Sequence, residues 1–160
     1  MELVFVKAIK EDIDQIFDLY QEVIRTTFTT WDDNYPSRDL IMEDIMNGDM
    51  YVLKNGNNII AVSFLDIYEN EAENWSNRLD KPIGIARICV DPKWQGRGVG
   101  TYFVCLLMEK AKEMGADGMH FHVCTLNASA MKMYERAGFI NCGQGESNYG
   151  YDYYKYEIVF

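Results

Sequence analysis

Two spacings of hydrophobic residues recur along this chain, and each predicts one kind of secondary structure. Apolar, β-branched and aromatic residues in short extended runs, several at a period of two, predict strands. These runs lie at residues 3–7, 50–54, 58–66, 83–90, 119–125 and 139–143, with a last one near the C-terminus. Apolar residues three and four positions apart, with polar residues between them, predict helices. These stretches lie at residues 11–25, 38–46, 101–114 and 128–137.

Polar residues mark the ends of these elements. Asn55-Gly56-Asn57 separates the second and third strands and is a strong hairpin signal. Ser37 and Asn127 stand where the N-caps of the second and fourth helices are expected, and Gly138 follows the fourth helix. Residues 68–82 form a polar connection around Trp75 that is longer than most loops, so we expect it to be functional or mobile.

The order of these elements predicts a mixed α/β sheet with helices on its faces. With 160 residues, 48% of them hydrophobic, we expect one domain over residues 1–160. The apolar runs are too short to cross a bilayer, and the N-terminus becomes charged too early for a secretory signal. Four cysteines lie in apolar segments without a Cys-x-x-Cys pair, so we expect buried free thiols and a cytoplasmic protein.

One stretch, VDPKWQGRGVGT at residues 90–101, joins a predicted strand to a predicted helix through three glycines. Glycine allows left-handed backbone and close approach of a ligand, and the first N–H groups of a helix lack partners within it. Such a loop is either a tight turn or a phosphate site. It lacks the glycine spacing of a dinucleotide fingerprint and the lysine of a Walker loop.

The loop reads Gln95-x-x-Gly98-x-Gly100, preceded by Val90-Asp91-Pro92 and followed by Asn127-x-x-Ala130-x-x-x-Tyr134-x-x-x-Gly138-Phe139. In this order, the two motifs resemble the acetyl-CoA motif of the GNAT family of N-acetyltransferases, over residues 83–139. The resemblance implies an α/β fold with a mixed central sheet of about seven strands, helices on both faces, and a splay between the fourth and fifth strands. It also implies acetyl-CoA as cosubstrate.

The resemblance implies roles for particular residues. The pyrophosphate would be bound by the main chain of the loop, with Thr101 close by, and the pantetheine would pair with the preceding strand and with Asn127. These cofactor-binding candidates are Ile88, Cys89, Val90, Gln95, Gly96, Arg97, Gly98, Val99, Gly100, Thr101, Asn127 and Tyr134. Tyr134 lies two helical turns after Asn127 and would protonate the departing thiolate, although core packing is the alternative for an inward tyrosine.

The amine acceptor must lose a proton before it attacks, so a base is expected. His122 is the first candidate, five residues before Asn127, where several family members carry a glutamate; a hydrogen-bonded structural histidine is the alternative. The resemblance places acceptor specificity in the loops before the second helix and before the last strand. The substrate-binding candidates are Trp31, Tyr35, Asp66, Tyr68, Arg87 and Tyr151. Arg87 is better suited to orienting an acidic group than to taking a proton.

The formal net charge of −10 argues against a nucleic-acid surface and weakly favours a cationic acceptor, although it can also serve solubility alone. The two histidines have no neighbouring ligand cluster, so no metal is expected. We therefore expect direct acetyl transfer from acetyl-CoA to a primary amine of a small molecule, with no membrane partner. The alternatives are a protein N-terminal or lysine acetyltransferase and a catalytically silent CoA-binding regulatory module. Loop aromatics leave a homodimer open.

Overall fold

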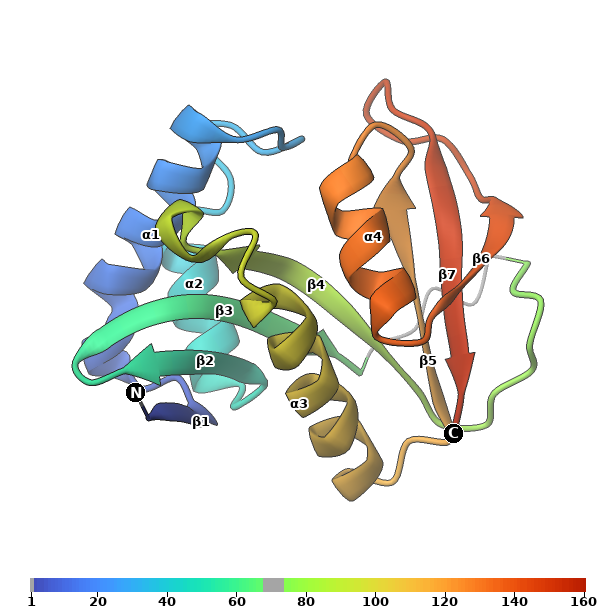
Figure 1. Ribbon diagram of the computed structural model, residues 1–160, viewed down its shortest axis with the longest axis horizontal. Helices are drawn as coiled ribbons and strands as arrows, with labels where there is room; N and C mark the ends of the chain where they lie inside the picture. The colour runs from blue at the N-terminus through green and yellow to red at the C-terminus, as the bar shows by residue number, and fades with distance from the viewer. Residues whose placement is uncertain (1, 68–73) are drawn as a thin grey trace. The chain divides into compact units, whose positions relative to one another are not determined.

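The computed structural model describes residues 2–67 and 74–160 (Figure 1). Its strands are β1 (Leu3–Lys7), β2 (Met50–Asn55), β3 (Asn58–Asp66), β4 (Pro82–Val90), β5 (Gly118–Cys124), β6 (Ile140–Gln144) and β7 (Tyr153–Val159). Its α-helices are α1 (Ile13–Thr26), α2 (Arg38–Met46), α3 (Val99–Glu113) and α4 (Ala128–Arg136), with 3-10 turns at Lys10–Asp12 and Pro92–Trp94. Within the described residues the sheet has seven strands in the order β1-β2-β3-β4-β5-β7-β6, which confirms the predicted fold class.

The chain divides into two compact units, and β4 contributes to both. The first unit comprises residues 1–65 and 86–103, and the second comprises residues 66–85 and 104–160. The expectation of a single domain stays a prediction.

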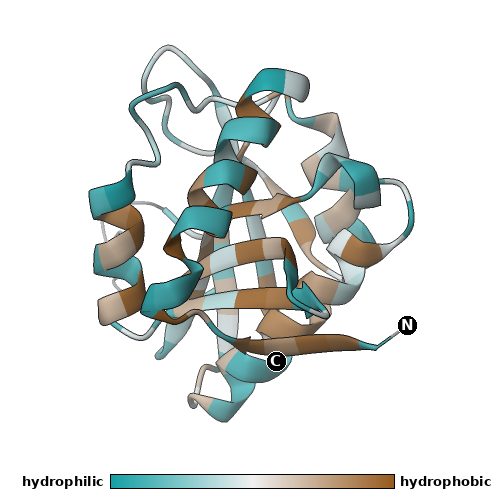
Figure 2. Ribbon diagram, turned by 90° about the vertical axis from the view of Figure 1, so that its left-hand side faces the viewer, coloured by the Kyte–Doolittle hydropathy of each residue, from teal (hydrophilic) through white to brown (hydrophobic). Residues whose placement is uncertain are grey.

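The first unit has an apolar core between two helices and the sheet. Helix α1 buries Ile16, Leu19, Tyr20 and Val23, the spacing that places side chains on one face of a helix. These residues belong to a core cluster that also includes Ile41 and Ile45 from α2 and residues of β2, β3 and β4. In Figure 2 the outer surfaces of the helices are largely hydrophilic, whereas the strands are largely hydrophobic. Burial of one such aliphatic side chain contributes about 1.5–3 kcal/mol.

Aromatic residues cover the other face of the same strands. The ring of Phe5 stacks on Tyr51 of β2 at 5.3 Å between centroids, and its edge meets Phe103 of α3 at 5.9 Å. The antiparallel pair β2–β3 turns at Gly56, which has a φ of 60°, as the hairpin signal predicted. The first unit therefore carries helices on both faces of its strands.

In the second unit, β5 lies between a parallel and an antiparallel neighbour. It pairs with the start of β4 through Pro82 and Ile83, and with β7 along its whole length, while β6 forms the edge beyond β7. Gly118 opens β5, and a Cβ there would lie 2.5 Å from the carbonyl oxygen of Ile158. The strand can therefore approach β7 so closely only because this residue has no side chain.

The caps Ser37 and Asn127 are confirmed, since their side chains accept hydrogen bonds from the N–H groups of Leu40 and Ala130. The expectation that all cysteines are buried is wrong. Cys89 and Cys124 are buried, but Cys105 is exposed and Cys142 is half-buried. Cys105 lies on the outward side of α3, because the helix buries Phe103, two positions before it, and Leu107, two positions after it. No helix in the described part of the chain has the length and hydropathy to span a membrane.

Candidate functional site

The glycine loop lies in the first unit, directly after β4. The N–H of Asp91 donates to the carbonyl of Ile60 at 2.8 Å, and its carboxylate accepts from the N–H of Lys93 at 2.9 Å, which starts the 3-10 turn. Gly96 and Gly98 follow with φ values of 76° and 80°. Residues with side chains rarely adopt this left-handed backbone, so the loop requires glycine at both positions.

The start of α3 leaves donors unused by the helix. Its first intrahelical bond runs from the N–H of Tyr102 to the carbonyl of Gly98 at 3.0 Å, which explains why the helix begins at Val99 rather than at Thr101. The N–H groups of Val99, Gly100 and Thr101 precede that bond and lie at the positive end of the helix dipole. The loop and the helix start together therefore have the features of an anion site.

Gln95 and Arg97 have side-chain roles inside the loop. The amide of Gln95 donates to the carbonyl of Val90 at 3.0 Å, which braces the loop against the end of β4. The guanidinium of Arg97 lies 5.2 Å from the centre of the Trp94 ring. At the end of β4, Cys89 and Val90 are buried and Ile88 is half-buried.

Cys89 is poorly suited to nucleophilic chemistry. Burial raises the pKa of its thiol well above the ordinary range, and the charge of Asp91 raises it further. Because the reactive species of cysteine is the thiolate, the protonated thiol disfavours a covalent route through this residue.

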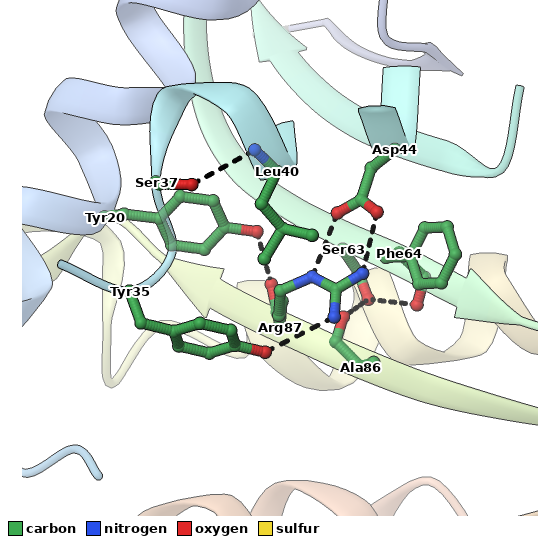
Figure 3. Close-up of polar contacts among 9 residues, drawn as sticks. All are labelled: Tyr20, Tyr35, Ser37, Leu40, Asp44, Ser63, Phe64, Ala86 and Arg87. Carbon is green, nitrogen blue, oxygen red and sulfur yellow. Dashed lines mark hydrogen bonds and ion pairs between the residues drawn. The ribbon is translucent and has the colours of Figure 1, made fainter. Parts of the chain in front are cut away.

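Arg87 lies just before this segment and is held by α2 and β3 (Figure 3). Its Nε and one terminal nitrogen donate to the two carboxylate oxygens of Asp44 at 2.9 and 2.8 Å. The other terminal nitrogen donates to the hydroxyl of Tyr35 at 3.4 Å, and the guanidinium lies 4.6 Å from the centre of the Phe64 ring. Burial alone would lower the pKa of Arg87, but the contacts with Tyr35 and Asp44 outweigh burial and raise it.

The aromatic residues of the loop between α1 and α2 have two different environments. Trp31 meets Tyr20 edge to face at 5.2 Å and packs against the core of the first unit. Tyr35 is 42% exposed and is joined to Asp32 by a pair of 3.2 Å main-chain hydrogen bonds. The structure thus brings Tyr35 and Arg87 together, whereas Trp31 serves packing.

Tyr134 lies in the second unit, on α4. Its ring is buried among Phe121 at 4.7 Å, Phe139 at 5.8 Å and Tyr156 at 6.0 Å. Burial raises the pKa of the phenol, and within residues 2–67 and 74–160 its hydroxyl has no hydrogen bond. The ring therefore packs in the core, and the role of the hydroxyl as an acid stays a prediction. Asn127 uses its carbonyl oxygen as the cap of the same helix, at 3.1 Å from the N–H of Ala130.

The two histidines of β5 contact one aromatic ring. Trp75 stacks on His120 at 3.8 Å and lies 4.9 Å from His122, as expected for residues on one strand face. Burial lowers the pKa of His120, whereas His122 is half-buried and also approaches Tyr153 at 6.3 Å. His122 is thus the less enclosed of the two.

The other acceptor candidates are placed separately. Asp66 ends β3 and is half-buried, and Tyr151 forms a short bridge with Asn148. Tyr68 lies outside the described residues. In residues 2–67 and 74–160, no three His, Cys, Asp or Glu side chains gather as a metal-binding group.

Three residues of these clusters were not singled out from the sequence. Tyr20 and Asp44 contact Arg87, and Glu157 is a buried carboxylate on β7 that accepts hydrogen bonds from the N–H groups of Ser76 and Asn77. A signal for Asp44 was available, because it stands three residues after Ile41 on the apolar face of α2.

Comparison with known proteins places the chain among acetyltransferases. The model of the acetyltransferase (GNAT) family matches residues 14–139, so the chain belongs to this family. An uncharacterized N-acetyltransferase of Methanocaldococcus jannaschii, MJ1207, is 35% identical over 68 residues, which cover 41% of this chain and 30% of the relative. The chain thus spans less than a third of that curated relative.

Solved structures share the fold. A GNAT-family acetyltransferase from Streptococcus agalactiae has a TM-score of 0.82 at 20% identity and covers 99% of this chain and 95% of its own. YncA from Salmonella typhimurium, solved with its cofactor acetyl-CoA, has a TM-score of 0.76 at 17% identity, over 98% of this chain and 93% of its own. At these identities the likeness concerns the fold.

Proposed function

We propose that this chain transfers the acetyl group of acetyl-CoA directly to a primary amine of a small cationic acceptor. Membership of the GNAT family carries the proposal. The glycine loop supports it, because Gly96 and Gly98 have left-handed backbone directly before the first N–H groups of α3, which have no partner within the helix. In this proposal those groups bind the pyrophosphate, and the main chain of Ile88, Cys89 and Val90 pairs with the pantetheine.

The proposed reaction needs an acid at the sulfur. The amine nitrogen attacks the thioester carbon, a C–N bond forms, the C–S bond breaks, and the departing thiolate takes a proton. Tyr134 is the proposed donor of that proton, since burial keeps its hydroxyl protonated. A main-chain N–H near Cys89 or Val90 is the proposed donor that polarises the carbonyl.

The reaction also needs a base for the ammonium proton. His122 is the proposed base, with Asp66 as a secondary candidate, because His122 is less enclosed than His120 and an imidazole side chain can take up a proton. Tyr35, which contacts Arg87 within the first unit, is a proposed acceptor-binding residue. A cationic acceptor is favoured by the net charge of −10, since negative potential concentrates cations near the protein.

The test has two parts. Calorimetry measures acetyl-CoA binding to the wild-type chain and to a Gly98→Ala variant, and thiol release measures transfer to a panel of amines, amino acids and peptides. The variant should bind acetyl-CoA at least about tenfold more weakly, because a side chain strains the left-handed backbone at residue 98. Gly56→Ala is the matched control, since Gly56 also has a positive φ and open space for a Cβ.

Four outcomes separate the alternatives. Faster thiol release with small diamines than with peptides supports the proposal, and the reverse order supports a protein acetyltransferase. Binding of acetyl-CoA without transfer to any amine supports a regulatory CoA-binding module. Failure of a folded wild-type chain to bind acetyl-CoA would refute the assignment of the glycine loop.

A further inference from the structure

Arg87 has an unusual backbone conformation for a residue in a strand. Its φ is 49°, and in the described chain only Tyr149, outside the strands, shares a positive φ among residues other than glycine. Such conformations are uncommon for residues with a Cβ and persist where their surroundings enforce them. The regular alternation of buried and half-buried residues in β4 also breaks here, since residues 86–88 are all half-buried. Strand β4 is therefore irregular at Arg87, a feature named here the kink of β4.

The backbone on both sides of the kink is held by hydroxyl groups (Figure 3). The phenol of Tyr20, from α1, donates to the carbonyl of Arg87 at 2.7 Å. The hydroxyl of Ser63, from β3, donates to the carbonyl of Ala86 at 3.1 Å. Tyr20 is fully buried, and burial raises its pKa, so the phenol remains a donor. Two consecutive carbonyls are thus fixed by side chains.

The side chain of Arg87 is fixed as firmly as its carbonyl. Asp44 binds it through two hydrogen bonds, and Phe64 lies under the guanidinium. The side chain of Asp44 is only 4% exposed and that of Arg87 only 15%. Loss of either partner would leave a buried charge without its counter-ion, so the pair strongly restricts the position of Arg87.

We infer that Arg87, Asp44 and Tyr20 form a clamp that holds the kink of β4, and that the clamp positions the main chain of residues 88–90 for acetyl-CoA. This inference rests on the proposed function, in which that main chain pairs with the pantetheine. Arg87 acts here as a positioning residue, because its side chain is bound to Asp44 and its effect on the cofactor passes through its backbone. Tyr35, which contacts the same guanidinium, links the loop before α2 to the clamp.

The test compares glycine with alanine at residue 87. Both substitutions remove the arginine side chain, but only glycine adopts a positive φ without strain. Both variants also carry Asp44→Asn, because the carboxylate of Asp44 would otherwise be buried without its counter-ion. The readouts are the dissociation constant of acetyl-CoA by calorimetry and the melting temperature without ligand.

Arg38→Ala is the matched control. The guanidinium of Arg38 also pairs with an aspartate, Asp14 at 2.5 Å, and also lies over a phenylalanine ring, Phe17 at 4.5 Å. It belongs to α2 and has no part in the kink, so this variant should keep wild-type affinity.

The clamp predicts that both double variants bind acetyl-CoA more weakly than the wild-type chain. It also predicts that the glycine variant binds about tenfold more tightly than the alanine variant, which corresponds to about 1.4 kcal/mol. The glycine variant should melt no lower than the alanine variant, the reverse of the usual order inside a strand.

Two contrary results are distinguishable. Equal affinities of the glycine and alanine variants, in a protein whose wild type binds acetyl-CoA, would overturn the role of the clamp and leave the proposed function intact. If the wild-type chain does not bind acetyl-CoA, the proposed function and the cofactor role of the clamp are both overturned. The order of the melting temperatures of the glycine and alanine variants would still show whether residue 87 needs a positive φ.

Discussion

Replacement of Tyr134 by phenylalanine should separate its packing from its chemistry. The variant keeps the ring and therefore its contacts with Phe121 and Phe139, at 4.7 and 5.8 Å. The lost hydroxyl has no hydrogen bond among residues 2–67 and 74–160, so no such bond is broken there. We expect the free energy of unfolding to change by less than about 1 kcal/mol.

The effect on turnover should be much larger. A positioned general acid contributes about 10²–10⁴-fold to a rate, which corresponds to about 2.7–5.5 kcal/mol of activation free energy. We expect kcat to fall by such a factor, whereas the dissociation constant of acetyl-CoA should change by less than about threefold. Because burial raises the pKa of Tyr134 above its ordinary value of 10.0, loss of its proton should not reduce the wild-type rate below about pH 9.

The assay is thiol release from acetyl-CoA with the fastest acceptor of the amine panel, with calorimetry of acetyl-CoA and urea unfolding of the same samples. Tyr156→Phe is the control, since Tyr156 is fully buried in the same aromatic cluster. An unchanged kcat in Tyr134→Phe would remove Tyr134 as the acid. An equal fall in both variants would show that the cluster acts through packing.

Three further predictions concern the second unit. Burial alone would raise the pKa of Glu157, but hydrogen bonds to its carboxylate outweigh burial and lower the pKa. The stability that the ionised carboxylate gives the folded protein should therefore be lost as pH falls below about 4.5. Urea unfolding at about pH 7 and pH 4 should show a smaller pH effect in Glu157→Gln than in the wild-type chain. Gly118→Ala should destabilise by about 1–3 kcal/mol, because its Cβ would lie 2.5 Å from the oxygen of Ile158, and thermal melting measures this loss. Asn127→Ala should lose a cap worth about 1 kcal/mol. Asn127→Asp should melt like the wild type yet bind acetyl-CoA more weakly if the amide donates to the pantetheine.

Features encoded locally could be predicted from the sequence. The caps Ser37 and Asn127 and the turn at Gly56 depend on residues a few positions apart, and each was confirmed. The glycine loop is local in the same sense, since the left-handed backbone at Gly96 and Gly98 is one that glycine adopts without strain. Helix and strand ends differ from the predictions by one or two residues where a single main-chain bond decides them.

Features that depend on distant partners could not be predicted. Arg87 was expected to suit an acidic group, but Asp44, the carboxylate that it binds, lies 43 residues away in the sequence and was not identified. Nothing in the spacing of strand residues indicated a kink at Arg87, because a positive φ there is enforced by contacts rather than by residue type.

Even so, the sequence contained a clue to the Asp44–Arg87 pair. Asp44 interrupts the apolar face of α2, and Arg87 is the one charged residue of β4, so each violates the hydrophobic pattern of its element. A buried charge without a partner destabilises the folded protein. When an acidic and a basic residue each interrupt an apolar pattern in one chain, they are therefore expected to pair. Glu157 limits the rule, because this buried carboxylate is satisfied by the N–H groups of Ser76 and Asn77 rather than by a cation. A charge on an apolar face thus predicts that a partner exists, and the available donors decide whether it is an ion or the main chain.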